Sequence, residues 1–229
     1  MTKKVIKKKK LKLTNFLLIL LAFFIVAFVA LSLLKIPVQN IVVLNNNYLG
    51  DDYILSLGKI KNYPKFFLTR SSRVEKDIEK SGYVKDAKLS KKFGFVFELY
   101  IFEYHPLFFD VNKNEYIFDD AHGVVDNDIS HQFRVPRLLN YIPNDKYTKF
   151  ISEMSKVRSN TISKISDIEY RPNEYDKDRF LLYMDDGNMV YLTLTKFKMI
   201  NHYNDVLKQL DNHKGILYLD NGNHFQIKE

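Results

Sequence analysis

Ser56 and Lys59 form the closest match in this sequence to a known catalytic motif. In penicillin-binding enzymes, a Ser-x-x-Lys motif places a lysine where it helps to activate a nucleophilic serine. Ser56-Leu57-Gly58-Lys59 has that spacing, but the companion motifs Ser-Asp-Asn and Lys-Thr-Gly are absent from the sequence. The match therefore predicts a helix end with a solvated lysine, and we expect no catalytic residue here.

Histidines and paired aspartates are the next candidates, because both residue types bind metal ions. None of the six histidines lies in a His-Glu-x-x-His motif or four residues from another histidine. A zinc site needs three or four converging ligands. Asp119-Asp120 and Asp185-Asp186 each lie near a glycine in a predicted turn, where aspartate is favoured for local hydrogen bonds. We therefore expect no metal site and no cofactor. The histidines are His105, His122, His131, His202, His213 and His224.

The absence of cysteine excludes disulfides, thiolate metal sites and a cysteine nucleophile.

The net charge of +8 is concentrated at the N-terminus. Seven lysines in residues 1–12 and Lys35 account for eight of the 35 basic residues, which leaves 27 basic and 27 acidic residues from position 36 onward. A nucleic-acid-binding groove would need a basic surface there, so we expect no nucleic-acid partner. The seven are Lys3, Lys4, Lys7, Lys8, Lys9, Lys10 and Lys12.

Phe16 to Leu34 is an apolar run of 19 residues without a charge. At about 1.5 Å per residue, such a helix covers nearly all of the roughly 30 Å hydrocarbon core of a bilayer. The lysines before the run and the single Lys35 after it predict a cytoplasmic N-terminus. We therefore expect a basic cytoplasmic tail at residues 1–15, a single transmembrane helix at 16–34 and extracytoplasmic domains after it.

A cleaved signal peptide is the alternative to a retained anchor. Ala30-Leu31-Ser32 matches the small-x-small cleavage pattern. The apolar stretch is longer than the roughly 7–15 residues of such a signal, and Leu33 and Leu34 continue it past the cut. The retained anchor is therefore the favoured interpretation.

Residues 36–106 are expected to form a first exported domain with the element order β-α-α-β-β. Its strands are predicted from β-branched and aromatic runs bounded by turn residues. Helices are predicted after Asp51 and from Ser72, where Ser72 and Glu75 match the Ser-x-x-Glu capping pattern. The last strand alternates apolar residues, which indicates one buried face. The predicted strands are 36–44, 83–90 and 95–104, and the alternating residues are Phe95, Phe97, Leu99 and Ile101.

Residues 107–229 are expected to form a second domain, a mixed and mostly antiparallel β-sheet with flanking helices. Apolar spacing predicts helices at 146–157 and 197–210. The last predicted strand, Ile216 to Leu219, follows Lys214-Gly215. The predicted fold class of the whole chain is α+β. The other predicted strands are 107–111, 116–118, 165–170, 180–184 and 189–194.

The order of these elements behind a membrane span resembles the bacterial cell-division family called FtsQ or DivIB. Glu103 to Pro106 resembles the Glu-Arg-x-Pro stretch that closes the family's POTRA domain. Asp119 to Val124 resembles its Asp-x-x-Gly-x-Val turn, and Arg134 to Leu138 its Leu-Pro-x-Leu element. Leu217-Tyr218-Leu219 departs from the family's Ile-Asp-Leu. The POTRA hairpin pattern is matched by Val84, Ala87, Leu89, Lys91, Gly94, Phe97, Leu99 and Ile101.

The resemblance implies a non-enzymatic, membrane-anchored scaffold of the divisome that coordinates septal peptidoglycan synthesis. It also implies binding to FtsB/DivIC-like and FtsL-like membrane division proteins at the division septum. Two other functions stay open: an exported cell-wall enzyme or regulator, and a transport-associated POTRA protein. The transport protein would carry tandem repeats, and we find no internal repeat in the sequence.

The partner-binding site implied by the resemblance is the last predicted strand, with residues Ile216, Leu217, Tyr218 and Leu219. In the family, this end of the β domain takes up its partners by adding a strand. A strand with few residues after it is expected at a sheet edge, where free backbone groups pair with another chain. Either Ile216 and Tyr218 or Leu217 and Leu219 would face the partner, and Tyr218 is favoured because tyrosine is enriched at hot spots. The other interpretation is that these residues complete the protein's own core.

Overall fold

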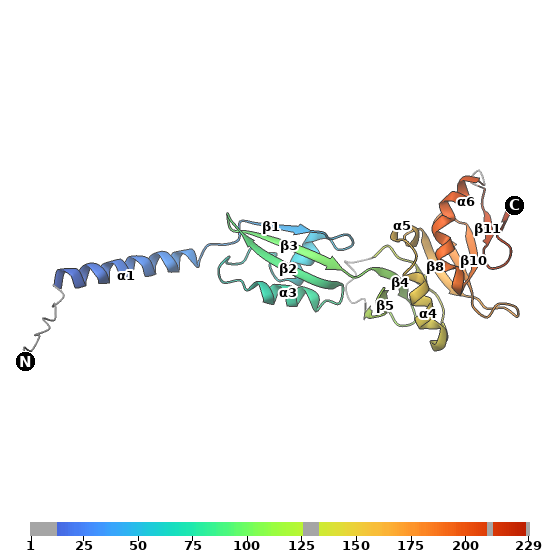
Figure 1. Cartoon of the computed structure of the whole chain (residues 1–229), viewed down its shortest axis with the longest axis horizontal. Coiled ribbons are helices and arrows are strands. Elements are labelled where there is room, and N and C mark those ends of the chain that lie inside the picture. The colour runs from blue at the N-terminus through green and yellow to red at the C-terminus, as the bar shows by residue number, and fades with distance from the viewer. Residues whose placement is uncertain (1–12, 126–132, 210–212, 228–229) are drawn as a thin grey trace, which may run out of the picture. The chain divides into compact units, whose positions relative to one another are not determined.

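The computed structural model describes residues 13–125, 133–209 and 213–227 (Figure 1). The chain divides into two compact units, Met1–Phe102 and Glu103–Glu229. Each unit carries a β-sheet of its own. Residues 1–12 of the tail that is expected to be cytoplasmic lie outside the described residues, and so does His131.

Helix α1 (Leu13–Leu33) has the length and composition to cross a membrane. Its 21 residues include no charge, and at about 1.5 Å per residue they extend over roughly 30 Å. None of its side chains is buried in the structure, whereas the core helix of a globular domain would be. The predicted N-terminal apolar helix is therefore confirmed, and within the described residues it extends over Leu13–Leu33 rather than 16–34.

The remainder of the first unit is a three-stranded sheet with two helices. Strand β1 (Asn40–Leu44) pairs in parallel with β3 (Val96–Glu103), and β3 also borders β2 (Val84–Lys92). Helices α2 (Asp51–Leu57) and α3 (Ser71–Glu79) connect β1 to β2. This is the predicted β-α-α-β-β order. Its fully or almost fully buried core includes Ile54, Val74, Ile78, Phe97, Leu99 and Ile101, which confirms the expected apolar face of the last strand for Phe97, Leu99 and Ile101. Phe95, expected on the same face, lies in the turn before β3 with a φ of 60°.

Helix α3 covers the outer edge of β2 with two glutamates. Glu75 Oε1 accepts a hydrogen bond from the backbone N–H of Leu89 at 2.8 Å. Glu79 Oε1 accepts one from the N–H of Ala87 at 3.3 Å. The predicted capping role of Glu75 is wrong, because α3 begins at Ser71 and its N-cap has no side-chain hydrogen bond. Glu75 instead satisfies a backbone donor of the strand that ends the sheet.

The second unit is built on a nine-stranded mixed sheet with the order β12-β11-β10-β9-β8-β7-β4-β5-β6. Parallel pairing joins β10 to β11, β7 to β8 and β4 to β7, and the other five neighbouring pairs are antiparallel. The predicted mixed and mostly antiparallel sheet is therefore confirmed. The strands are β4 (Pro106–Asp110), β5 (Glu115–Phe118), β6 (Gly123–Val125), β7 (Arg137–Leu138), β8 (Ile165–Tyr170), β9 (Arg179–Met184), β10 (Met189–Thr193), β11 (Gly215–Tyr218) and β12 (His224–Ile227).

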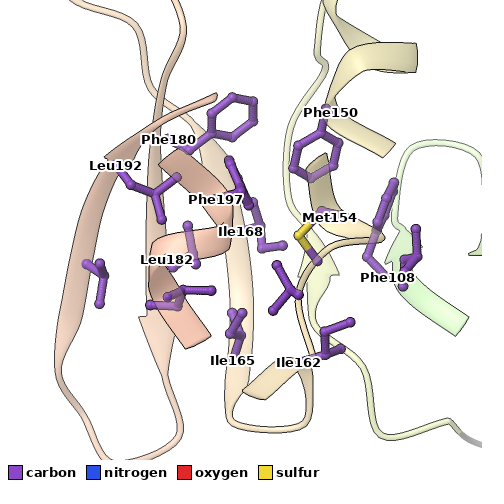
Figure 2. Packing of buried hydrophobic residues seen from close by; sticks show 14 of the residues in the cluster. Phe108, Phe150, Met154, Ile162, Ile165, Ile168, Phe180, Leu182, Leu192 and Phe197 are labelled. Atoms are coloured by element: carbon purple, nitrogen blue, oxygen red, sulfur yellow. The ribbon is translucent and has the colours of Figure 1, made fainter. Parts of the chain in front are cut away.

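An aromatic cluster forms the centre of the core in this unit. The helices are α4 (Asn144–Met154), α5 (Ser159–Ile162), the 3-10 helix η1 (Leu194–His202) and α6 (Tyr203–Gln209). Phe150 of α4 stacks on Phe180 of β9 with ring centroids 5.0 Å apart. Phe197 of η1 meets both rings edge-on at 5.3 and 5.1 Å (Figure 2). The cluster thus packs α4 and η1 against β9, which neighbours β10 in the sheet.

The segment predicted as one helix over 197–210 is a 3-10 helix followed by a short α-helix. Its buried residues recur every three positions, and an amphipathic α-helix would alternate spacings of three and four. Side chains three apart lie on one face of a 3-10 helix, so the spacing of three favours that conformation here. Residue 210 lies outside the described residues. The buried residues are Leu194, Phe197, Ile200 and Tyr203.

Candidate partner-binding edge

Strand β11 carries the predicted site, but it does not lie at the edge of the sheet. It pairs in parallel with β10 on one side and antiparallel with β12 on the other. The prediction that residues 216–219 form the edge is therefore wrong. The chain turns back after Asn221, with positive φ angles of 85° at Gly222 and 49° at Asn223. Asn-Gly is a strong hairpin signal, and it marks the β11–β12 turn that sequence reasoning missed.

The residues of the predicted site separate onto two faces. Leu217 and Leu219 are 4% and 6% exposed and belong to the core cluster. Ile216 and Tyr218 are half-buried on the opposite face, as period-two alternation requires. Leu217 and Leu219 thus stabilise this protein's own core, and Ile216 and Tyr218 are the members of the set placed toward solvent.

Tyr218 is part of a row of stacked side chains that crosses four strands. Its ring lies between Tyr191 of β10 and His224 of β12, with centroid distances of 5.4 and 4.6 Å and interplanar angles of 18° and 10°. The guanidinium of Arg179 on β9 lies 3.6 Å from the Tyr191 centroid. We call these four residues the cross-strand row. Stacking of this kind ties β12 to the strands behind it.

An ion pair fixes the start of the turn into β12. Arg179 Nε donates to Asp220 Oδ2 at 2.6 Å, and both side chains are largely buried. Lys196 Nζ donates to the carbonyl oxygen of Leu219 at 2.9 Å. Because β12 begins four residues after Asp220, these contacts hold the hairpin on the sheet.

Gly215 lets β12 approach β11 closely. A Cβ at this position would overlap the carbonyl oxygen of Gln226 and lie 2.8 Å from the Phe225 ring. The N–H of Gly215 donates to Asn188 Oδ1 at 2.8 Å, and Asn188 is 1% exposed. Glycine is therefore required by packing rather than by an unusual φ at this residue.

A buried polar network supports the beginning of β11 from behind. Asn188 Nδ2 donates to the Tyr203 hydroxyl at 2.9 Å, and that hydroxyl donates to the Asp186 carboxylate at 2.8 Å. Burial, together with the Asp186 hydrogen bond, holds the pKa of Tyr203 well above its ordinary value. Tyr203 therefore stays a protonated donor at neutral pH, and the network links the β9–β10 turn to α6 and β11.

Strand β12 ends the sheet. Within the described residues, its strand neighbour is β11 alone. Phe225 packs against the core cluster, while His224, Gln226 and Ile227 are exposed. An edge strand presents unpaired backbone donors and acceptors that another chain can extend. The residues of this edge, like Arg179 and Tyr191 behind it, were not among the predicted site residues.

The catalytic and metal-binding candidates are engaged in local contacts. Ser56 Oγ donates to the carbonyl oxygen of Tyr53 at 2.6 Å, and Lys59 Nζ pairs with Asp77 at 3.3 Å. Asp120 accepts a hydrogen bond from the backbone N–H of His122, as expected of turn chemistry. In the described part of the chain, no three His, Asp or Glu residues are grouped to hold a metal ion.

Comparison with known proteins gives a family match and several relatives. A family model described as "POTRA domain, FtsQ-type" matches residues 36–104. Cell division protein DivIB of Listeria monocytogenes is 24% identical over 229 residues, covering 96% of this chain and 84% of that protein. DivIB of Brevibacillus brevis is 28% identical over 220 residues, with coverage of 89% and 80%. The FtsQ-type match includes the three-stranded sheet and both of its helices.

A solved structure is also similar to part of the chain. It is the major extracytoplasmic domain of the cell division protein DivIB from Geobacillus stearothermophilus, with 18% identity and a TM-score of 0.39. The match covers 48% of this chain and 95% of that structure. DivIB of Bacillus subtilis is 24% identical over 231 residues, covering 97% of this chain and 88% of that protein. The sequence matches therefore extend across both compact units.

Proposed function

Because the chain belongs to the FtsQ/DivIB family of bacterial cell-division proteins, we propose that it is a non-enzymatic scaffold of the divisome. In this role it binds other single-span division proteins and coordinates septal peptidoglycan synthesis. Two findings support the proposal: the FtsQ-type POTRA match, and relatives whose sequences align with almost the whole length of this chain.

The proposed topology places the N-terminus in the cytoplasm and residues 36–229 outside the cell. Helix α1 supplies the anchor, and seven lysines precede the apolar run while one follows it. Protease added to intact, wall-stripped cells should then remove the large domains and spare the N-terminal tail. Digestion of the tail with survival of the domains would contradict this orientation, and a mature product that begins at Leu33 would contradict a retained anchor.

The proposed partners are FtsB/DivIC-like and FtsL-like membrane proteins, bound at the C-terminal end of the sheet. The observation that carries this proposal is the edge position of β12, one strand beyond the residues 216–219 first considered. A partner strand would pair with the backbone of β12, and the exposed side chains beside it would contribute specificity. In this arrangement Ile216 and Tyr218 lie behind the added strand, and Tyr218 acts by holding His224 and Gln226 in place.

Capture of the partners by full-length protein tests the proposal. A chain that ends at Asn223 lacks β12, so we expect its capture of co-expressed DivIC-like and FtsL-like proteins to fall by about tenfold or more. Circular dichroism and thermal unfolding of the same variant monitor whether the second unit stays folded. Lys177→Ala, on the surface between β8 and β9, is a matched control that leaves β12 intact. Undiminished capture by the folded truncated chain would exclude β12 as the binding edge.

A further inference from the structure

One end of the three-stranded sheet gathers three separate segments of the first unit. Strand β1 begins at this end, and the turn between β2 and β3 lies there too (Figure 1). Phe66 N–H donates to the carbonyl oxygen of Ile36 at 2.9 Å, and Gln39 N–H donates to that of Phe95 at 2.9 Å. Lys91 Nζ donates to the carbonyl oxygen of Phe66 at 2.6 Å. The residues just after α1, the loop before α3 and the β2–β3 turn therefore form one continuous surface, which we call the basal surface.

The basal surface is basic. Residues 53–74 contain no acidic residue, and the end of β2 adds Lys91 and Lys92. Some of these charges are neutralised, since Lys61 pairs with Asp52 and Lys92 with Glu98. In the part of the chain that the structure describes, several basic side chains on or beside this surface form no ion pair with a carboxylate. They include Lys65, Arg70 and Arg73, which the salt bridges of this unit leave out.

A groove lies beside these unpaired charges. Its volume is about 890 Å³, and its lining includes Lys65, Leu68, Arg70 and Arg73. The acid in its lining, Asp77, is already paired with Lys59 and Lys80. Cationic side chains in a fixed groove suit phosphate groups, which accept hydrogen bonds from lysine and arginine.

Exposed apolar side chains lie next to the basic ones. Phe93, in the β2–β3 turn, is fully exposed, and Phe67 and Leu68 are 45% and 55% exposed. Phe66 beneath them is buried and meets the Phe95 and Phe97 rings at 5.4 Å, which gives the surface a rigid base. Exposed aromatic residues mixed with lysine and arginine are typical of surfaces that contact the membrane interface.

The length of the chain keeps this surface close to the end of the anchor. Ile36, which binds Phe66, lies three residues after Leu33, the last residue of α1. Three residues span at most about 10 Å even when fully extended. Where α1 crosses a membrane, the basal surface is therefore held within reach of the lipid headgroups, whichever way the unit is rotated about the connection.

We propose that the basal surface binds anionic phospholipid at the outer face of the membrane, with Lys65, Arg70 and Arg73 contacting phosphates and Phe93, Phe67 and Leu68 entering the interface. The proposal rests on the anchoring part of the proposed function and is independent of partner binding at β12. Its consequence is that the three-stranded sheet and its two helices are fixed on the membrane surface instead of rotating freely on their connection to α1.

The absence of tryptophan from the protein allows a direct test. Phe93→Trp introduces a single tryptophan, which can be excited selectively beside the tyrosines, at the fully exposed turn. Phe102→Trp is a matched control in the same unit, 46% exposed and about 20 Å further along β3. Both full-length variants are reconstituted into proteoliposomes that contain phosphatidylglycerol and a headgroup spin-labelled lipid.

We expect the spin label to quench Phe93→Trp fluorescence more strongly than Phe102→Trp, by about twofold or more, because a tryptophan at the interface lies within range of the label. The emission of Phe93→Trp should also shift to shorter wavelength. Equal quenching of the two variants would overturn the proposal. Shielding of Phe93→Trp that appears only when partner proteins are added would overturn it too.

The charge requirement is tested on the Phe93→Trp background. Replacing Lys65, Arg70 and Arg73 with glutamine, or replacing phosphatidylglycerol with phosphatidylcholine, should bring quenching toward the level of the control, because anionic headgroups attract the basic residues. Quenching that persists in both cases would overturn the phosphate contacts. Resistance of the protein to alkaline extraction tests whether α1 anchors it in the membrane, and partner capture tests the binding edge at β12. If the anchor or the β12 edge is wrong, one of these two assays fails, whereas an error in the lipid-binding proposal changes only the quenching.

Discussion

The outer edges of β2 and β12 are treated differently by the residues around them. At β2, Glu75 and Glu79 of α3 accept hydrogen bonds from the N–H groups of Leu89 and Ala87. At β12, the described part of the chain places no helix or strand beyond the edge. The first edge has partners for its backbone donors, whereas the second is available for pairing with another chain.

The difference indicates where strand addition is favourable. A partner strand at β2 would have to displace two charge-assisted hydrogen bonds, and each of these contributes about 1.5–3 kcal/mol. A strand at β12 would replace only water. The cross-strand row and the buried Arg179–Asp220 pair also hold β12 in a fixed position, which lowers the entropic cost of binding.

Opening the β2 edge should have the largest effect on stability. Glu75→Ala combined with Glu79→Ala leaves the N–H groups of Leu89 and Ala87 without acceptors, so we expect a loss of about 2–4 kcal/mol. Urea unfolding measures it, and sedimentation shows whether the open edge causes self-association. Glu75→Gln with Glu79→Gln keeps an acceptor at each position and should recover much of the stability. No difference between the two double variants would mean that the carboxylates do not close this edge.

Gly215→Ala should loosen the β12 edge. The added Cβ overlaps the carbonyl oxygen of Gln226, so β12 must move and the second unit should lose about 1–3 kcal/mol. Partner capture should fall with it, because the displaced strand no longer presents its edge. Gly50→Ala is a suitable control, since a Cβ there meets nothing within 4 Å. If both variants retain wild-type stability and capture, close packing at Gly215 does not position the edge.

Tyr218→Ala should have a smaller effect, on both stability and binding. The substitution removes two stacked contacts, so we expect about 1 kcal/mol of destabilisation. We expect a further 1–2 kcal/mol or so of lost partner affinity, because His224 and Gln226 lose their support. Tyr218→Phe keeps the stack and loses only the hydrogen bond to Gln226. Isothermal titration with the partner separates the two variants, and equal affinity of the alanine variant and wild type would remove Tyr218 from the site.

The apolar helix and the β-α-α-β-β order could be predicted because their signals are local. The charge-free run after Leu13 is long and apolar enough to indicate a membrane helix by itself. The alternation of Phe97, Leu99 and Ile101 follows the two-residue period of a single strand. The pattern Ser72-x-x-Glu75 was misleading, because the partner of Glu75 is the N–H of Leu89, fourteen positions along the chain. A capping signal cannot reveal a contact that forms only when the helix packs on a strand.

The candidate site was harder to predict for the same reason. The four residues of the cross-strand row come from four strands, and their contact depends on the parallel pairing of β10 with β11. The turn at Asn221-Gly222 was visible locally, but His224 to Ile227 is too short and too polar to stand out as a strand. The sequence left open whether Ile216 and Tyr218 or Leu217 and Leu219 face a partner, and only the structure showed that Leu217 and Leu219 lie in the core.

Amide hydrogen exchange of the full-length protein, with and without the proposed DivIC-like and FtsL-like partners, tests the central claim most directly. Free edge amides exchange rapidly, and pairing with a partner strand slows them. We expect the partners to protect amides in residues 224–227 and to leave the exchange of residues 84–92 unchanged. Protection that appears in β2 instead, or in neither strand while the partners are bound, would contradict the assignment of β12 as the binding edge.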